Sequence, residues 1–182
     1  MNVFEAISQR REITSFLDKK IPQADLETLL DAGYLAPSGN NLPSREFILV
    51  TARDKLDQLA NATPFMPWLK QAQAGIVVTG RPDVSKYWLQ DASIACGFIW
   101  LQAVELGLGA AFGAVYHSQD KEESKRRENF VRKELSIPSD RVVVAILGFG
   151  YPKEFPEKKK LLPREEIVQA AKQGRQVLWS RR

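Results

Sequence analysis

The chain has 182 residues, of which 44% are hydrophobic and 26% charged. This is an ordinary globular composition, and the length suits one sizeable core, so we expect a single domain over residues 1–182. The formal net charge of +4 is mildly basic, but Lys and Arg are interspersed with Asp and Glu, which gives nucleic-acid binding only weak support. The single cysteine excludes an internal disulfide and a Cys-x-x-Cys redox pair.

The sequence offers no sign of export or of membrane insertion. The N-terminus reaches Arg10-Arg11 too soon for the apolar run of a signal peptide. The longest apolar stretch, residues 92–104, is too short to span a bilayer and contains Ser93 and Gln102. We therefore predict a cytoplasmic protein without a membrane partner.

The predicted elements alternate along the chain between helices and strands. Hydrophobic periodicity predicts helices at about residues 2–10, 22–36, 54–62, 84–106, 121–135 and 165–172. Short β-branched runs predict strands at residues 46–51, 75–79, 110–116 and 141–148. This mixture indicates an α+β or α/β architecture in which helices cover a central sheet.

The long helix predicted at residues 84–106 is unusual because its segment 92–104 is apolar nearly all round. Such a helix needs apolar contacts on every side, and a chain of this size can rarely surround one completely. We therefore expect it to pack against a partner subunit.

Familiar catalytic motifs are absent from the sequence. His117 is the only histidine, which excludes a multi-histidine metal site, and its position after a predicted strand favours a loop residue without a catalytic role. Cys96 lies within the apolar helix and is interpreted as a core residue. Neither a P-loop nor a Gly-x-Gly-x-x-Gly fingerprint occurs. These absences favour a protein whose cofactor performs the chemistry, with no catalytic side chain and no metal.

Several segments, in chain order, carry a resemblance to a known family. They are RREITSF at 10–16, APSGNNLPSREF at 36–47, the helix from Gln90 that ends in Gly-Leu-Gly at 107–109, the strand ending LGFGYP at 147–152, and the lysines at 158–160. Each is weak alone, but together they resemble the FMN-dependent nitroreductase family over nearly the whole chain. The resemblance implies an α+β fold with a central mixed, mostly antiparallel sheet flanked by helices. It also implies a long helix at a homodimer interface and a tail, from about residue 152, that packs on the partner subunit.

By this resemblance, the first segment holds the FMN phosphate. The implied residues are Arg10, Arg11, Glu12 and Thr14, together with Lys159. Guanidinium groups beside a helix end suit a phosphate, although two solvated arginines would also be ordinary at such a position. Thr14 and Leu161 stand where the family has arginines, so the phosphate site has fewer cations than the family pattern.

The remaining implied residues surround the flavin ring and the ribityl chain. They are Pro37, Ser38, Gly39, Asn41, Phe112, Gly113, Ala114, Val115, Gly148 and Gly150. The amide of Asn41 offers both a donor and an acceptor, and Gly113 would allow the backbone to approach the ring closely. Four aromatic residues could line an acceptor pocket, although core packing is the more usual role for each: Phe65, Trp68, Tyr87 and Trp88.

The resemblance implies a tightly bound FMN that takes hydride at N5 from NADH or NADPH. A nitroaromatic, a quinone or another conjugated acceptor would then be reduced in a ping-pong cycle. The expected partners are a second copy of the chain and a small-molecule electron acceptor, without nucleic acid or metal. An alternative is a non-catalytic flavin- or phosphate-ligand-binding protein. A nucleic-acid-binding module is a third interpretation, supported only by the net charge and the Lys-rich tail.

Overall fold

An antiparallel four-stranded sheet lies at the centre of the computed structural model, which describes residues 1–158 and 160–168. The strand order is β1-β2-β4-β3, and the strands are β1 (Arg45–Val50), β2 (Ala74–Gly80), β3 (Gly109–Ala114) and β4 (Val142–Gly150). The α-helices are α1 (Val3–Gln9), α2 (Gln23–Tyr34), α3 (Arg53–Leu59), α4 (Trp88–Glu105), α5 (Lys121–Leu135) and α6 (Arg164–Ile167). Two short 3-10 turns, η1 (Gly39–Asn41) and η2 (Pro67–Lys70), complete the fold.

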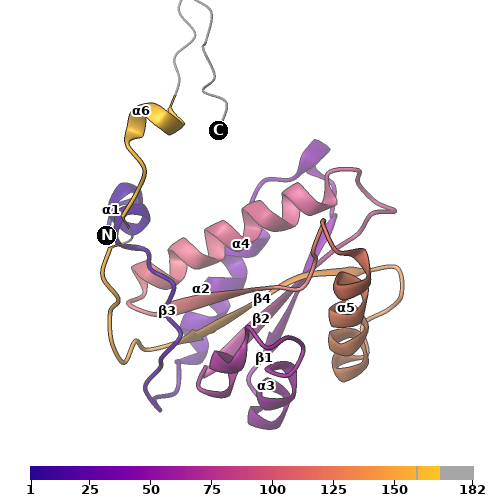
Figure 1. The fold of residues 1–182 in the computed structure, drawn as a ribbon, viewed down its shortest axis with the longest axis horizontal. Helices are drawn as coiled ribbons and strands as arrows, with labels where there is room; N and C mark the ends of the chain where they lie inside the picture. Colours follow the sequence, from indigo (N-terminus) through magenta and orange to yellow (C-terminus); the bar gives the residue numbers. More distant parts are fainter. Residues whose placement is uncertain (159, 169–182) are drawn as a thin grey trace, which may run out of the picture.

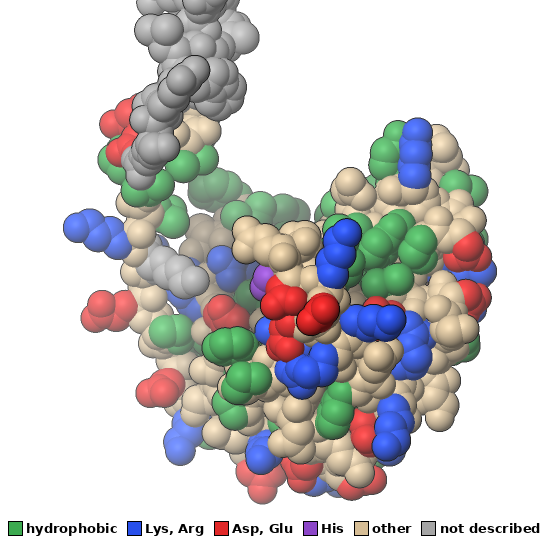
Figure 2. Space-filling view, turned by 45° about the vertical axis from the view of Figure 1, so that its right-hand side comes forward, with side chains coloured by type: hydrophobic (Ala, Val, Ile, Leu, Met, Phe, Trp, Pro, Cys, Tyr) green, Lys and Arg blue, Asp and Glu red, His purple; other side chains and the backbone are tan. Residues whose placement is uncertain are grey.

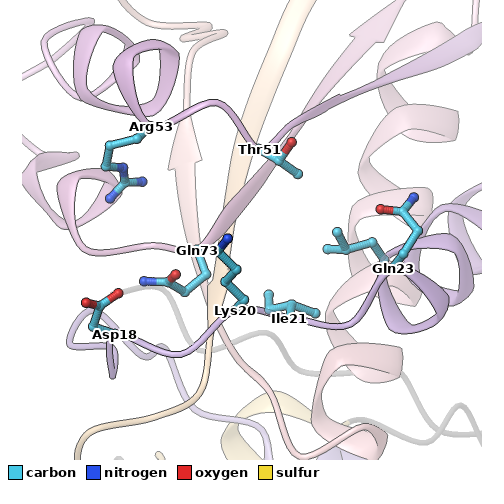
Figure 3. Close-up of a pocket in the computed structure, with 8 residues that line it drawn as sticks. Asp18, Lys20, Ile21, Gln23, Thr51, Arg53 and Gln73 are labelled. Carbon is cyan, nitrogen blue, oxygen red and sulfur yellow. The ribbon is translucent and has the colours of Figure 1, made fainter.

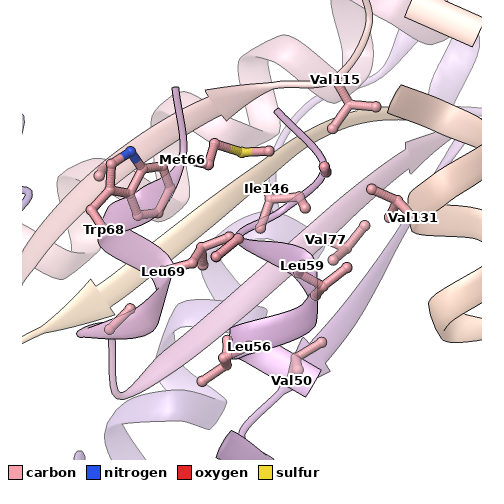
Figure 4. Packing of buried hydrophobic residues seen from close by; sticks show 14 of the residues in the cluster. Val50, Leu56, Leu59, Met66, Trp68, Leu69, Val77, Val115, Val131 and Ile146 are labelled. Carbon is pink, nitrogen blue, oxygen red and sulfur yellow. The ribbon is translucent and has the colours of Figure 1, made fainter. Parts of the chain in front are cut away.

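Helices cover both faces of this sheet (Figure 1). β2 is buried along its whole length, and its alternating side chains serve two cores because successive residues of a strand point to opposite faces. Ile76 and Val78 join the core under α2 and α4. Val77 and Ile146 join the core under α3, η2 and α5, which Figure 4 shows from close by.

Local sequence signals explain where several helices begin and end. α1 starts with a capping box in which the side chains of Asn2 and Glu5 each accept a backbone N–H of the other. α5 starts at Asp120, whose side chain accepts the Glu123 amide, and it ends at Ser136 in a left-handed conformation (φ 54°).

The predicted α+β class is confirmed, and the differences from expectation are local. The four strands pair only antiparallel; in the described residues the parallel component is one isolated bridge between Glu12 and Ala110. α4 begins at Trp88 instead of residue 84, because residues 84–87 form a turn in which the Ser85 hydroxyl accepts the Tyr87 amide. Within the described residues, no helix is long and apolar enough to cross a membrane.

Candidate functional site

The predicted site residues fall mainly into two segments at opposite ends of α4. The first loop (residues 10–16) follows α1 and lies beside the second half of the helix, where Arg10 covers Trp100. The Asn41 loop (residues 36–44) lies beside the helix start, where it contacts Asp91. The α4 residues that these segments contact, Asp91 and Trp100, are nine residues apart, which is roughly 14 Å along the helix axis. Figure 1 shows α1 beside only one end of this helix. One copy of the chain therefore keeps the two segments apart.

The first loop is fixed to the sheet through its backbone. The Ile13 amide donates to the carbonyl of Ala110 (2.9 Å), next to the Glu12–Ala110 bridge. The Arg11 Nη1 donates to the carbonyls of Ser8 (3.0 Å) and Arg10 (2.7 Å). This part of the sequence therefore forms a short added segment against the start of β3, and the arginines project from it.

The charges of the first loop fit a phosphate group. Arg10 and Arg11 are half-buried, and within the described residues neither forms an ion pair. Glu12 and Thr14 are exposed, and the Glu12 carboxylate does not neutralise either arginine in this part of the chain. Guanidinium donors that lack a carboxylate partner are a suitable donor set for a phosphate dianion. Lys159, the third predicted cation, lies outside the described residues.

The Asn41 loop is held to α4 by a buried carboxylate that the sequence reasoning did not assign to the site. Asp91, only 3% exposed, accepts the Gly39 amide (2.9 Å) and the Ser44 hydroxyl (2.5 Å). Hydrogen bonds to a charged group each contribute about 1.5–3 kcal/mol. Asp91 could have been found from its helical spacing. It stands four residues before Ala95, and this spacing places the carboxylate on the same, buried face of α4.

The tip of the Asn41 loop presents its polar groups outward. Asn40 and Asn41 both have positive φ (55° and 56°), a conformation that Asn tolerates better than most residues. The Ser38 hydroxyl donates to the carbonyl of Leu42 (2.9 Å), and the backbone N–H of Asn41 donates to the carbonyl of Ser38 (3.0 Å). The Asn41 side chain is exposed, as is Pro37. A hollow of about 560 Å³ lies beside the loop.

The predicted β3 residues differ in what they can offer a ligand. Phe112 is half-buried and stacks on Trp100 with 6.2 Å between ring centroids. Ala114 is exposed, although its carbonyl accepts Arg127 Nη1 (3.0 Å). Val115 has a fully buried side chain, and its amide donates to Val144 (3.0 Å). Phe112 and Ala114 are therefore the more accessible of these predicted contacts.

The three predicted glycines of β3 and β4 are packed against side chains of the same chain. A Cβ at Gly113 would collide with Met66, and one at Gly148 with Trp68. A Cβ at Gly150 would lie 2.8 Å from the Phe16 ring. The close approach that each glycine permits in this structure is therefore to an internal side chain.

The four aromatic candidates for an acceptor pocket divide into packed and exposed residues. Trp68 is buried against Gly148, and Trp88 meets Tyr116 edge to face at 5.5 Å. Phe65 is 74% exposed and Tyr87 is 41% exposed. Exposure therefore favours Phe65 and Tyr87 as residues that could meet a small molecule.

Groups with their own chemical reactivity have structural roles here. The His117 Nδ1 accepts the Asp120 amide (3.0 Å), which secures the turn before α5. Burial raises the pKa of the Cys96 thiol to about 12, so the thiolate is rare near neutral pH. Within the described ranges, no group of three or more His, Cys, Asp or Glu side chains is arranged to hold a metal ion.

Two further surface features lie outside the predicted site. A cavity of about 440 Å³ is lined by Asp18, Lys20, Thr51, Arg53 and Gln73, among others, and it contains no predicted site residue (Figure 3). Blue and red side chains are interspersed on the face drawn in Figure 2, which is unlike the single-sign patch of a nucleic-acid interface.

Comparison with known proteins gives consistent matches. The sequence profile described as the Nitroreductase family matches residues 7–64 and 62–151. A protein of Methanothermobacter thermautotrophicus, provisionally named NADH dehydrogenase/NAD(P)H nitroreductase, is 32% identical over 170 residues, which are 92% of this chain and 86% of that protein. A similarly named structure from Bacteroides thetaiotaomicron has a TM-score of 0.84 at 32% identity, covering 92% of this chain and 96% of its own. An FMN-dependent nitroreductase structure from Clostridium difficile has a TM-score of 0.81 at 31% identity, and the match covers 92% of this chain and 98% of that chain.

Proposed function

The chain belongs to the nitroreductase family, and we propose that it is an FMN-dependent oxidoreductase that uses NADH or NADPH to reduce a nitroaromatic, a quinone or another conjugated acceptor. The observation that carries this proposal is the combination of Arg10, Arg11 and Asn41. These are the positions that the family pattern assigns to FMN, and their polar groups have no ionic partner in the part of the chain that the structure describes. The cytoplasmic location remains a prediction from the sequence.

We infer that the active form is a homodimer. The exposed face of α4 carries Ile94 (42% exposed) and Phe98 (44% exposed), and α1 adds Val3 and Phe4 (72% and 78%). Val3 and Phe98 line one hollow, and a group of exposed large apolar side chains commonly marks an interface. A second copy that covers α4 would bring its own Asn41 loop towards the first loop of its partner, and so complete a site that one chain leaves divided.

The tail is proposed to contribute to the same interface. Pro152 pairs with Phe16, which ties the start of the tail to the first loop. Beyond it, Phe155 is 75% exposed and Leu161 is 84% exposed. Apolar side chains with such exposure favour packing on the partner subunit. Lys159, as a phosphate contact, remains a prediction.

When bound, FMN would supply the redox chemistry, accepting hydride at N5 from NAD(P)H and delivering it to the acceptor in a ping-pong cycle. The residues of this chain would bind the cofactor and orient it. Arg10 and Arg11 would neutralise the phosphate, and the Asn41 amide would pair with polar atoms of the flavin or its ribityl chain. Asp91 keeps the Asn41 loop in one conformation before the ligand arrives.

The test begins with the purified full-length chain. Flavin released by denaturation is identified, the mass in solution is measured by sedimentation, and NADH and NADPH oxidation is followed with a nitroaromatic and with a quinone. We expect a yellow dimer and parallel lines in double-reciprocal plots. A colourless protein that gains no flavin from added FMN would contradict the proposal. A protein that binds FMN but oxidises neither nicotinamide would instead be the non-catalytic binder.

A further inference from the structure

Three groups from three different elements form a stack beside the first loop. The indole of Trp100 on α4 contacts both the Arg10 guanidinium and the Phe112 ring of β3. The Arg10 Cζ is 4.7 Å from the centroid of a Trp100 ring. The Trp100 and Phe112 planes are 5° apart, with 6.2 Å between centroids. This stack joins a residue predicted to bind phosphate to one predicted to lie near the flavin.

The indole orients Arg10 without occupying its donors. Arg10 makes no side-chain hydrogen bond to any described residue, whereas Arg11 Nη1 is already engaged by two backbone carbonyls. A guanidinium that lies over an aromatic face keeps its N–H groups, which lie in its own plane, available to an anion. The contact also reduces the number of side-chain conformations from which Arg10 must be recruited when a ligand binds.

We propose that Trp100 is a positioning residue that holds Arg10 ready for the FMN phosphate, an inference that rests on the proposed function. Thr14 stands where the family pattern has a further cation, so the remaining arginines must supply more of the phosphate binding. Restraining Arg10 over Trp100 strengthens the contribution of Arg10 to phosphate binding without adding another charge.

The Trp100 Nε1 atom makes it possible to test the aromatic face of Trp100 separately from its hydrogen-bonding capacity. It is buried and has no hydrogen-bond partner in the structure. Trp100→Phe therefore removes a donor that makes no bond, while it keeps an aromatic face, although Trp is the strongest of the aromatic partners for a cation. Trp100→Leu removes the face altogether. The two substitutions separate the cation–aromatic contact from the rest of the side chain.

The experiment compares equilibrium affinities for FMN and for riboflavin, which has the same ring and ribityl chain but no phosphate. The variants are Arg10→Ala, Trp100→Leu, Trp100→Phe and the double Arg10→Ala/Trp100→Leu, with Trp88→Leu as a control from the same helix. Trp88 packs on Tyr116, and no cation of the described residues lies over it. The readout is the ratio of the two affinities, because a merely structural defect would weaken both flavins together.

We expect Arg10→Ala to lower the preference for FMN about tenfold or more, as loss of a charge-assisted contact would. Trp100→Leu should lower it about three- to tenfold, within the range of a cation–aromatic contact, and Trp100→Phe by less than about threefold. The double variant should resemble Arg10→Ala, since Trp100 acts through Arg10. Trp88→Leu should leave the ratio unchanged.

The inference is overturned if Trp100→Leu keeps the wild-type ratio while Arg10→Ala lowers it, or if the two effects add in the double variant. Should Trp100→Leu fail to fold, Trp100→Met removes the aromatic face with a longer apolar chain and is held to the same criteria. A wild-type chain that binds neither flavin would contradict the proposed function itself. A wild-type chain that binds both equally would overturn only the role of Arg10 and Trp100.

Discussion

The two ends of α4 hold their candidate binding segments by different means. At the first-loop end, backbone bonds fix the chain to β3, and the two arginines have no carboxylate partner among the described residues; Arg10 lies over an indole, and Arg11 Nη1 donates to two backbone carbonyls. At the Asn41-loop end, the buried carboxylate of Asp91 fixes the chain, and a neutral amide projects. The positive charges of the first loop are thus available to a ligand, whereas the Asp91 carboxylate at the other end is engaged in holding the Asn41 loop. The first end suits a phosphate, and the second suits the neutral polar edge of a flavin.

The largest expected effect concerns the dimer. In the proposed site, the first loop of one subunit and the Asn41 loop of the other bind the same FMN. Phe98→Asp would place a charge in the exposed apolar face of α4, where a partner would have to desolvate it. We expect a monomer by sedimentation and at least about a hundredfold loss of FMN affinity, corresponding to about 2.7 kcal/mol or more. Phe98→Leu, which keeps the face apolar, should remain dimeric. A Phe98→Asp monomer with wild-type FMN affinity would show that one chain suffices.

The second effect concerns the Asn41-loop end alone. Asp91→Ala would leave the Gly39 amide and the Ser44 hydroxyl without their acceptor, at a cost of about 3–6 kcal/mol in the free energy of unfolding. FMN and riboflavin should lose affinity equally, because neither lost bond involves the phosphate. Asp91→Asn keeps one acceptor oxygen and should recover part of the stability. Urea unfolding and flavin titration measure both quantities, and an unequal loss for the two flavins would contradict this division of roles.

The sequence predicted most elements because hydrophobic periodicity directly reports which face of a helix or strand is buried. Val142–Gly150 was recognisable as a strand from its β-branched run, and the long apolar segment correctly indicated the helix α4, whereas the expected packing of that helix on a partner subunit stays a prediction. The start of α4 was placed too early because a hydrogen bond from the Tyr87 backbone N–H to the Ser85 hydroxyl fixes a turn before it. Such a bond leaves no periodic signal.

The candidate site was less predictable, since pairwise contacts across the fold are not written in any local pattern. Nothing near Arg10 in the sequence indicates that Trp100, ninety residues later, lies beneath it. A side chain does approach Gly113 closely, but it is that of Met66, and the expected approach to a flavin ring stays a prediction. A glycine pattern reports that something approaches the backbone without saying what it is.

A third prediction tests β3, which contacts the first loop at Ala110. Gly113→Ala would drive a methyl group into the fully buried Met66, and overpacking of this kind costs about 1–3 kcal/mol of stability. Gly113→Ala/Met66→Ala makes room for the new methyl, so the two losses should be less than additive. Thermal unfolding of both single variants and the double variant measures the coupling. Strict additivity would show that Met66 does not fill this position in solution.

The smallest expected effect distinguishes the two ends of β3 by their response to acid. The start of β3 is held to the first loop by the Ile13–Ala110 backbone bond, which has no titrating group. At the other end, Arg127 reaches the Ala114 carbonyl while it is paired with Glu123. Hydrogen bonds from Arg126 and Arg127 lower the pKa of Glu123 to about 2. Because this folded-state pKa lies below the ordinary value of about 4.3, the stabilisation is complete above that value and is lost as the pH falls towards 2.

Hydrogen exchange of the Val115 and Tyr116 amides should therefore accelerate, relative to that of Ile13, as the pH is lowered from 5 to 2.5, after correction for intrinsic rates. The change should be small, since Glu123 is solvent-accessible and exposed ion pairs are weak. Glu123→Gln removes the titrating group while keeping an acceptor, so its relative exchange rates should stay constant over this range. An equal pH response in wild type and Glu123→Gln would show that the Glu123–Arg127 pair does not help to hold this end of β3.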